Sequence, residues 1–301
     1  MTPDSFPWST AGRAFALTLS AAAGPACGHA TSRTPSVVPA STAAETQAMK
    51  EILFPPPFAL AVVEDAIVRV VGPTMTCSGT LVEDDLVLTS HHCLVQRGEH
   101  GEFKKTLLGP KAINIELGGD YLPWGSVRVK AVVAPPCGEA GGAGDLAILV
   151  LNRKLVGLST MTPRLDAPPR IGETIDPVGF GMCATTQEGI RRRPRLGGPI
   201  RALTGETIEL SAQICPGDSG GPLLLRGTHE VVGVVSLSAM DGVDQTWGAS
   251  VVARLDSYRS VFSNARLIAD GADPAEVPPL TCLADEKLES LKLPRLRPVP
   301  R

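Results

Sequence analysis

One serine of the chain stands in a glycine-rich segment. The segment Cys215-Pro-Gly-Asp-Ser-Gly-Gly-Pro222 places three glycines and an acid around Ser219, between two strand-like runs. Glycines at this density let the backbone adopt positive φ angles, so that backbone N–H groups can converge on one point. A serine hydroxyl is a weak nucleophile until a neighbouring base takes its proton. The segment therefore predicts a nucleophilic serine that needs a histidine and a carboxylate from elsewhere in the chain.

The base must come from five histidines, of which one adjacent pair has a suitable setting. His91 and His92 end a strand-like run, whereas the others lie in polar, turn-like or spacer segments: His29, His100 and His229. The pair stands in Leu86-Val-Leu-Thr-Ser-His-His-Cys93, and Cys77-Ser-Gly-Thr-Leu-Val precedes it. This arrangement resembles trypsin-like serine proteases, in which the cysteine after the histidine is bridged to one sixteen residues earlier. The resemblance implies that His92, and not His91, is the base, and that Cys77 pairs with Cys93.

An aspartate at the head of an apolar run completes the set. Asp145 stands in Gly144-Asp-Leu-Ala-Ile-Leu-Val-Leu151, and the chain order His, Asp, Ser is that of the trypsin-like family. Taken alone, such an aspartate could simply cap a turn at a strand start. By the resemblance, its carboxylate fixes the tautomer of His92 and stabilises the imidazolium that forms when Ser219 loses its proton. The backbone N–H groups of Gly217 and Ser219 are then expected to form the oxyanion hole.

Two further segments resemble strands of the family's second barrel. Val178-Gly-Phe-Gly181 is similar to its Gly-aromatic-Gly strand, and Val232-Gly-Val-Val-Ser-Leu237 is similar to its substrate-pairing strand. Ser236 lies in the second of these and is expected to contact substrate.

The resemblance also places the residues of the specificity pocket. Gln213, six positions before the nucleophile, would lie at the base of the pocket, with Ser238 and Gly248 on its walls. A neutral amide cannot compensate the desolvated charge of a bound Arg or Lys side chain. Cleavage after neutral residues is expected, unless Asp241 or Asp244 reaches into the pocket.

One family feature is missing from the sequence. Trypsin-like zymogens are activated by a cleavage that frees an Ile/Val-Val-Gly-Gly terminus, whose amine pairs with the aspartate before the nucleophile, but no such motif precedes Cys77. Asp218 therefore needs another cationic partner if it is buried, and the sequence does not identify it. The run Arg191-Arg-Arg-Pro-Arg195 is predicted to be a solvated basic loop, with an anion site or a processing site as alternatives.

The seven cysteines lie far apart and form no zinc-like cluster, which favours a disulfide framework and predicts no metal site and no cofactor. Cys183 is expected to pair with Cys215, because that bond would tie the strand after Gly-Phe-Gly to the serine loop. Cys137 and Cys282 then pair by elimination, and Cys27 is left over. Disulfides require an oxidising compartment, so an export signal is expected.

The N-terminus carries a candidate signal. Arg13 precedes an apolar run over residues 14–26 that ends in small residues and is too short to span a bilayer, although a buried helix is the alternative. No other stretch predicts a membrane span. Cys27 resembles a bacterial lipoprotein acceptor, so a lipid anchor competes with ordinary cleavage. We expect a bacterial protein that is secreted or held in the cell envelope, extracellular, periplasmic or lipid-anchored.

Short Val/Ile/Leu-rich runs recur between turn residues along the rest of the chain, and they predict antiparallel barrels or a sandwich. The resemblance implies an all-β fold of two antiparallel six-stranded barrels with a C-terminal helix, which the spacing of Leu255, Tyr258 and Phe262 supports. The expected parts are a signal peptide (1–27), a flexible linker (28–50), a peptidase domain (51–270) and a Pro-rich tail (271–301). Within the domain the barrels span about 58–162 and 172–254, and the helix spans 255–270.

The function expected from these features is a secreted serine endopeptidase that acts on proteins or peptides through an acyl-enzyme. A net charge of −3 without a basic stripe argues against nucleic-acid binding. The alternative is a catalytically weak, protease-like binding protein. Esterase activity is a third option, but the serine segment lacks the strand–turn–helix setting of a nucleophile elbow.

Overall fold

The computed structural model describes residues 62–119, 122–138, 143–182, 191–238 and 248–281. The chain divides into two units, Met1–Pro55 and Pro56–Arg301, and every described residue belongs to the second. The signal peptide and the linker expected at 1–50, with Cys27, therefore lie outside the described residues. Within the described part, no helix has the length and apolar character needed to cross a bilayer.

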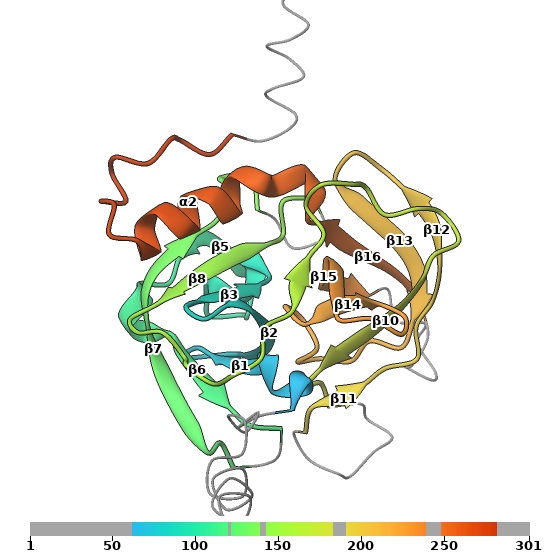
Figure 1. Cartoon of the computed structure of the whole chain (residues 1–301), viewed down its shortest axis with the longest axis horizontal. Helices are drawn as coiled ribbons and strands as arrows, with labels where there is room; N and C mark the ends of the chain where they lie inside the picture. The colour runs from blue at the N-terminus through green and yellow to red at the C-terminus, as the bar shows by residue number, and fades with distance from the viewer. Residues whose placement is uncertain (1–61, 120–121, 139–142, 183–190, 239–247, 282–301) are drawn as a thin grey trace, which may run out of the picture. The chain divides into compact units, whose positions relative to one another are not determined.

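The first half of the second unit is a closed antiparallel barrel, in the order β1-β2-β3-β8-β7-β6 (Figure 1). Residues of β7 alternate between core and surface, with Val127, Val129, Ala131 and Val133 buried, as a strand with one solvated face requires. Strand β8 is buried along its whole length because α2 covers its outer face. The six strands are β1 (Ile67–Val71), β2 (Thr76–Glu83), β3 (Leu86–Thr89), β6 (Asn114–Leu117), β7 (Gly125–Val133) and β8 (Ala147–Leu151).

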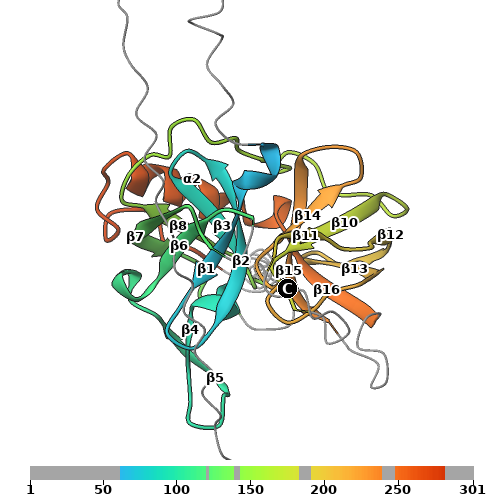
Figure 2. The same cartoon turned by 90° about the horizontal axis from the view of Figure 1, so that it is seen from below.

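The second half is another closed six-stranded barrel, in the order β10-β12-β13-β16-β15-β14, which closes where β14 pairs with β10. Figure 2 shows the two barrels side by side. Its strands are β10 (Thr174–Gly179), β12 (Gly198–Leu203), β13 (Thr207–Ala212), β14 (Pro222–Leu225), β15 (Glu230–Ser238) and β16 (Gly248–Arg254). The predicted fold class, two antiparallel six-stranded barrels with a C-terminal helix, is confirmed.

Several short elements that the sequence did not predict are attached to the barrels. A hairpin of β4 (Val95–Arg97) and β5 (Phe103–Leu107) follows the histidine pair and extends away from the first barrel in Figure 2. Two-residue strands flank the second barrel: β9 (Thr162–Pro163) pairs with β15, and β11 (Arg193–Pro194) pairs with β10. Single 3-10 turns complete the set: η1 (Val63–Ala66), η2 (His91–Leu94), η3 (Pro110–Ala112) and η4 (Asp256–Tyr258).

The C-terminal helix packs on the first barrel, although it follows the last strand of the second. Helix α2 (Arg259–Ala269) lies against β7 and β8 and buries Val261, Phe262, Ala265 and Ile268, which share one face (Figure 1). The predicted range 255–270 begins with the turn η4, and the α-helix proper starts at Arg259. Gly271, with φ +111°, ends it in the left-handed conformation that favours glycine. The helix therefore joins the two barrels.

Candidate active site

Strand register brings His92 and Asp145 together at one end of the first barrel. Strand β3 runs into the turn that carries His92, and Asp145 stands two residues before β8. Because β3 and β8 are antiparallel, with Thr89 opposite Ala147, the residues after β3 lie beside those before β8. The pair thus comes from segments more than fifty residues apart in the chain.

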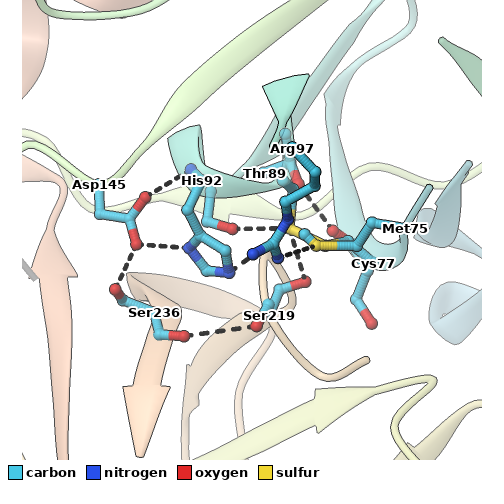
Figure 3. Close-up of polar contacts among 11 residues, drawn as sticks. Met75, Cys77, Thr89, His92, Arg97, Asp145, Ser219 and Ser236 are labelled. Atoms are coloured by element: carbon cyan, nitrogen blue, oxygen red, sulfur yellow. Dashed lines mark hydrogen bonds and ion pairs between the residues drawn. A yellow bond between two sulfur atoms is a disulfide. The ribbon is translucent and has the colours of Figure 1, made fainter. Parts of the chain in front are cut away.

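Asp145 is fully buried and holds His92 by two contacts (Figure 3). Its Oδ1 accepts the backbone N–H of His92 at 2.8 Å, and its Oδ2 lies 2.7 Å from His92 Nδ1. The hydroxyl of Ser236 donates a third, short hydrogen bond to Oδ2. An ionised carboxylate accepts only, so the proton of a neutral His92 ring sits on Nδ1 and the lone pair on Nε2.

Ser219 lies in the loop between β13 and β14, in two tight turns. Asp218 N donates to Cys215 O at 3.0 Å, and Gly221 N donates to Asp218 O at 2.9 Å. Gly217 has φ +100°, which L side chains rarely adopt, so this position favours glycine. The Ser219 hydroxyl points to the Ser236 carbonyl at 3.4 Å, and within the described residues it makes no hydrogen bond to His92. Catalytic hydrogen bonds of this kind are often long without substrate and tighten when it binds.

Ser78 in β2 links the serine loop to the first barrel. Its backbone N–H donates to Ser219 O at 2.8 Å, and its hydroxyl donates to Gly217 O at 2.8 Å. The same hydroxyl accepts the N–H of Phe180 at 2.9 Å. The hydroxyl of Ser78, from the first barrel, therefore bonds two segments of the second half, the serine loop and the residue that follows β10. This role was not predicted from the sequence, although Ser78 directly follows Cys77 in the quoted motif.

A cavity of about 500 Å³ lies beside these residues, between the barrels. Apolar side chains form much of its wall, and the only formal charge among its described lining residues is Arg97 of β4. Arg97 stacks on Phe103 of β5, 3.4 Å from the ring centroid, and its Nη1 donates to Gly101 O at 2.8 Å. The described lining includes Met75, His92, Arg97, Ile214, Ser219 and Ser236.

The expected specificity residues are placed by strand register. Gln213 is half-buried, directly follows β13, and its N–H donates to Leu196 O at 2.8 Å. Ala212 pairs with Gly248, and Ser238 pairs with Ser250, so the ends of β13, β15 and β16 meet beside Gln213. Asp241 and Asp244 lie outside the described residues. Ser236, expected to contact substrate, is among the residues that line the cavity, and its hydroxyl donates to Asp145.

Disulfides brace the site. Cys77 and Cys93 are bonded, with Cα atoms 6.2 Å apart. Cys137 and Cys215 each take part in a further disulfide. Their expected partners, Cys282 for Cys137 and Cys183 for Cys215, lie outside the described residues. Ligand atoms of Cys77, His92 and Cys93 lie within 4.8 Å of one another, but the two sulfurs are bonded to each other and offer no thiolate to a metal.

His91, the other member of the histidine pair, lies in a different environment. It is buried, and its ring lies so close to Gly138 that a Cβ there would approach within 2.4 Å. Burial lowers the pKa of His91, against the opposing charge of Asp145. His91 is therefore neutral near pH 7.

The basic run does not form the solvated loop that the sequence predicted. Arg195 is 8% exposed and pairs with Asp218, with Nε 2.9 Å from Oδ2. Arg192 pairs with Asp65 at 2.7 Å. The prediction failed because a charge run indicates solvation only on average, and here the adjacent strand β11 directs Arg195 inward. Arg195 is the cationic partner that Asp218 needs.

Comparison with known structures identifies the class of fold. A solved structure of neuropsin, described as a serine protease expressed in the limbic system of mouse brain, superposes with a TM-score of 0.50 at 18% identity. The match covers 68% of this chain and 97% of that one. The two-barrel architecture is therefore the chymotrypsin-like fold.

Comparison of sequences identifies the family. The family model described as Trypsin matches residues 64–262. Snake venom serine protease Haly-2 of Gloydius brevicauda is 25% identical over 190 residues, 53% of this chain and 66% of that protein. Trypsin zeta of Drosophila erecta is 26% identical, over 65% of this chain and 72% of that protein. An uncharacterized peptidase of Corynebacterium glutamicum (strain R) is 24% identical, over 71% and 73%. The chain belongs to the trypsin family of serine-type endopeptidases.

Proposed function

We propose that the protein hydrolyses peptide bonds, with Ser219 as nucleophile, His92 as general base and Asp145 as the residue that orients His92. The observation that carries this proposal is the contact between His92 Nδ1 and Asp145, which leaves the lone pair of Nε2 for the proton of a serine hydroxyl. Ser219 lies in the same cavity wall as His92.

The proposed reaction has two halves. Ser219 Oγ attacks the carbonyl carbon of the scissile bond while His92 Nε2 takes its proton, and the N–H groups of Gly217 and Ser219 stabilise the oxyanion. His92 then gives that proton to the amine leaving group, and the acyl group stays on Ser219. A water molecule, deprotonated by His92, attacks the acyl carbon, and the returned proton regenerates the Ser219 hydroxyl.

Two alternatives compete with proteolysis at this site. A protease-like binding protein would keep the fold without a reactive serine. The buried pair of His92 and Asp145 argues against it, because replacing such a pair with apolar side chains is often neutral or stabilising, so a protein without catalysis would not need to keep it. An esterase would use the same acyl-enzyme chemistry. Hydrolysis of an amide substrate distinguishes a peptidase from it.

We also propose an extracellular or cell-envelope location. The disulfide between Cys77 and Cys93 supports it, because such bonds persist in oxidising compartments. The expected signal ending before Cys27 makes a lipid anchor there part of the same proposal. Mass spectrometry of the mature N-terminus tests it: a diacylated Cys27 supports the anchor, and an unmodified start beyond Cys27 rejects it.

Paired variants test the proposed catalysis. Ser219→Ala and His92→Ala should each reduce hydrolysis of a peptide mixture by about 10⁴-fold or more while circular dichroism stays unchanged. His91→Ala is the matched control, since it removes the adjacent buried imidazole, and it should keep activity within about tenfold. Equal losses in the folded His91 and His92 variants would reject His92 as the base.

A further inference from the structure

The residue before Ser219 carries a charge that the protein must neutralise. Asp218 is fully buried, and a buried carboxylate costs several kcal/mol unless it is paired and hydrogen-bonded. Oδ1 accepts the N–H of Gly181 at 2.7 Å, and Oδ2 accepts the N–H of Cys215 at 2.9 Å. These two bonds fix the carboxylate between the strand end of β10 and the serine loop, but they supply no positive charge.

Arg195 supplies that charge. Its Nε lies 2.9 Å from Asp218 Oδ2, and its Nη2 lies 3.1 Å from Oδ1, so the guanidinium grips both oxygens. Nη2 also donates a short bond to Gly181 O, and the Arg195 backbone N–H donates to Pro177 O at 2.7 Å. The pairing of β11 with β10 fixes the backbone beside Arg195, and the bonds to Asp218 and Gly181 hold its side chain without any substrate.

Two glycines, one at the end of β10 and one two residues later, leave room for this ion pair. A Cβ on Gly179 would lie 2.5 Å from Asp218 Oδ1, and one on Gly181 would lie 2.5 Å from Asp218 Cγ. Both distances are far below a van der Waals contact, and the carboxylate that they meet is held by the hydrogen bonds described above. The Gly-Phe-Gly segment therefore leaves the space that the Asp218 carboxylate occupies.

The ion pair lies next to the peptide groups expected to form the oxyanion hole. Asp218 stands between Gly217 and Ser219, so the bonds that hold its side chain also limit how far the two flanking peptide groups can turn. Without a cation, the carboxylate would tend toward solvent and would pull the loop with it. The second fixed point of the loop is Ser78, which bonds Gly217 O and Ser219 O.

We infer that Arg195 is a positioning residue for the oxyanion loop, and that this loop forms without any cleavage that frees a new N-terminal amine. The inference rests on the proposed function and adds its regulation. The contacts described for the carboxylate come from within the chain, from Gly181, Cys215 and Arg195. An incoming amine would have to displace a bidentate arginine. The protein is therefore competent once folded.

The first test compares two arginines of the second barrel. Arg195→Met should lower kcat on a neutral peptide ester by about 10²- to 10³-fold, the loss expected when an oxyanion donor is misplaced, with little change in KM. Arg226→Met is the matched control, because Arg226 grips Asp176 through bonds of 2.6 and 2.8 Å at the surface. It should leave kcat unchanged.

A conservative variant keeps this test decisive if Arg195→Met does not fold. Arg195→Lys retains the charge but not the two-pronged grip, so its kcat should fall between those of the wild type and Arg195→Met, by about tenfold, with KM unchanged. A folded Arg195→Lys or Arg195→Met protein with a kcat within about twofold of the wild type would overturn the positioning role.

The second test asks whether the N-terminus matters. The secreted full chain and a version extended by a short uncleavable N-terminal sequence should have equal kcat, with intact mass showing each terminus. Activity that appears only after a terminus is freed upstream of Val62 would overturn the inference and leave the proposed function standing. Activity absent before and after such trimming would reject both.

Discussion

His92 contacts Asp145 twice, through its ring and through its own backbone: Nδ1 lies 2.7 Å from Oδ2, and the backbone N–H lies 2.8 Å from Oδ1. The two bonds fix both the position of the residue and the rotation of its ring. They use both oxygens of one carboxylate, so a group with a single oxygen can satisfy only one of them.

Asp145→Asn should therefore lower kcat by about 10⁴-fold while the protein stays folded. The amide oxygen can still accept the backbone N–H, but its NH₂ would face Nδ1 and favour the tautomer with the proton on Nε2, which cannot act as base. Kinetics on a peptide amide measure the loss, with the exposed Asp166→Asn as control. A wild-type kcat in the Asp145→Asn variant would show that the carboxylate does not set the tautomer.

The strand pattern, together with the motif resemblance, predicted the two barrels, because most strands are apolar runs between turn residues. Strand β12 has no such run, since it begins Gly198-Pro199 and shows no clean alternation, and β5 has none because almost all of it is exposed. Both are specified by pairing with neighbours rather than by their own residues.

The site could be predicted where residues are close in sequence to a recognisable motif. The partner of Asp218 could not, because the contact from Arg195 spans 23 residues and depends on how β11 pairs with β10. A run of arginines is usually solvated, and nothing in its composition separates the buried member from the others. The role of Ser78 could not be predicted for a similar reason, since its partners belong to the second barrel.

The ion pair between Asp85 and helix α2 predicts how the stability of the fold changes at acid pH. Asp85, between β2 and β3, accepts from Arg266 of α2, with Nη1 2.8 Å from Oδ1, and this bond lowers the pKa of Asp85 below 3.8 despite its burial. The folded-state pKa lies below the unfolded one, so the stabilisation is complete above about pH 3.8 and is lost as the pH falls through the folded pKa.

Asp85→Asn should accordingly lower the free energy of unfolding by about 1–3 kcal/mol at about pH 7, and by much less near pH 2.5. Urea unfolding at both pH values measures the difference, and the exposed Glu276→Gln serves as control. A deficit of equal size at both pH values would mean that the ionised pair contributes nothing to stability.

The lining of the site predicts which bonds are cut. Among the described residues that line the cavity the charged side chain is Arg97, and Gln213, which directly follows β13, is neutral. Cleavage after Arg or Lys should be disfavoured, because no acidic side chain among the described lining residues compensates a desolvated cation. Gln213→Asp should raise kcat/KM for Arg and Lys substrates by about tenfold or more, whereas Gln213→Asn should not. Peptide-library profiling measures both, and a wild-type preference for Arg or Lys would contradict this interpretation of the pocket.

The reactivity of Ser219 is tested most directly by the site of covalent capture. The intact protein is treated with a fluorophosphonate, digested, and sequenced by tandem mass spectrometry. We expect one adduct, on the hydroxyl of Ser219, and its loss in the His92→Ala variant, because the serine needs a base to react. An adduct on another residue, or no adduct on a folded protein, would contradict the assignment of Ser219 as nucleophile.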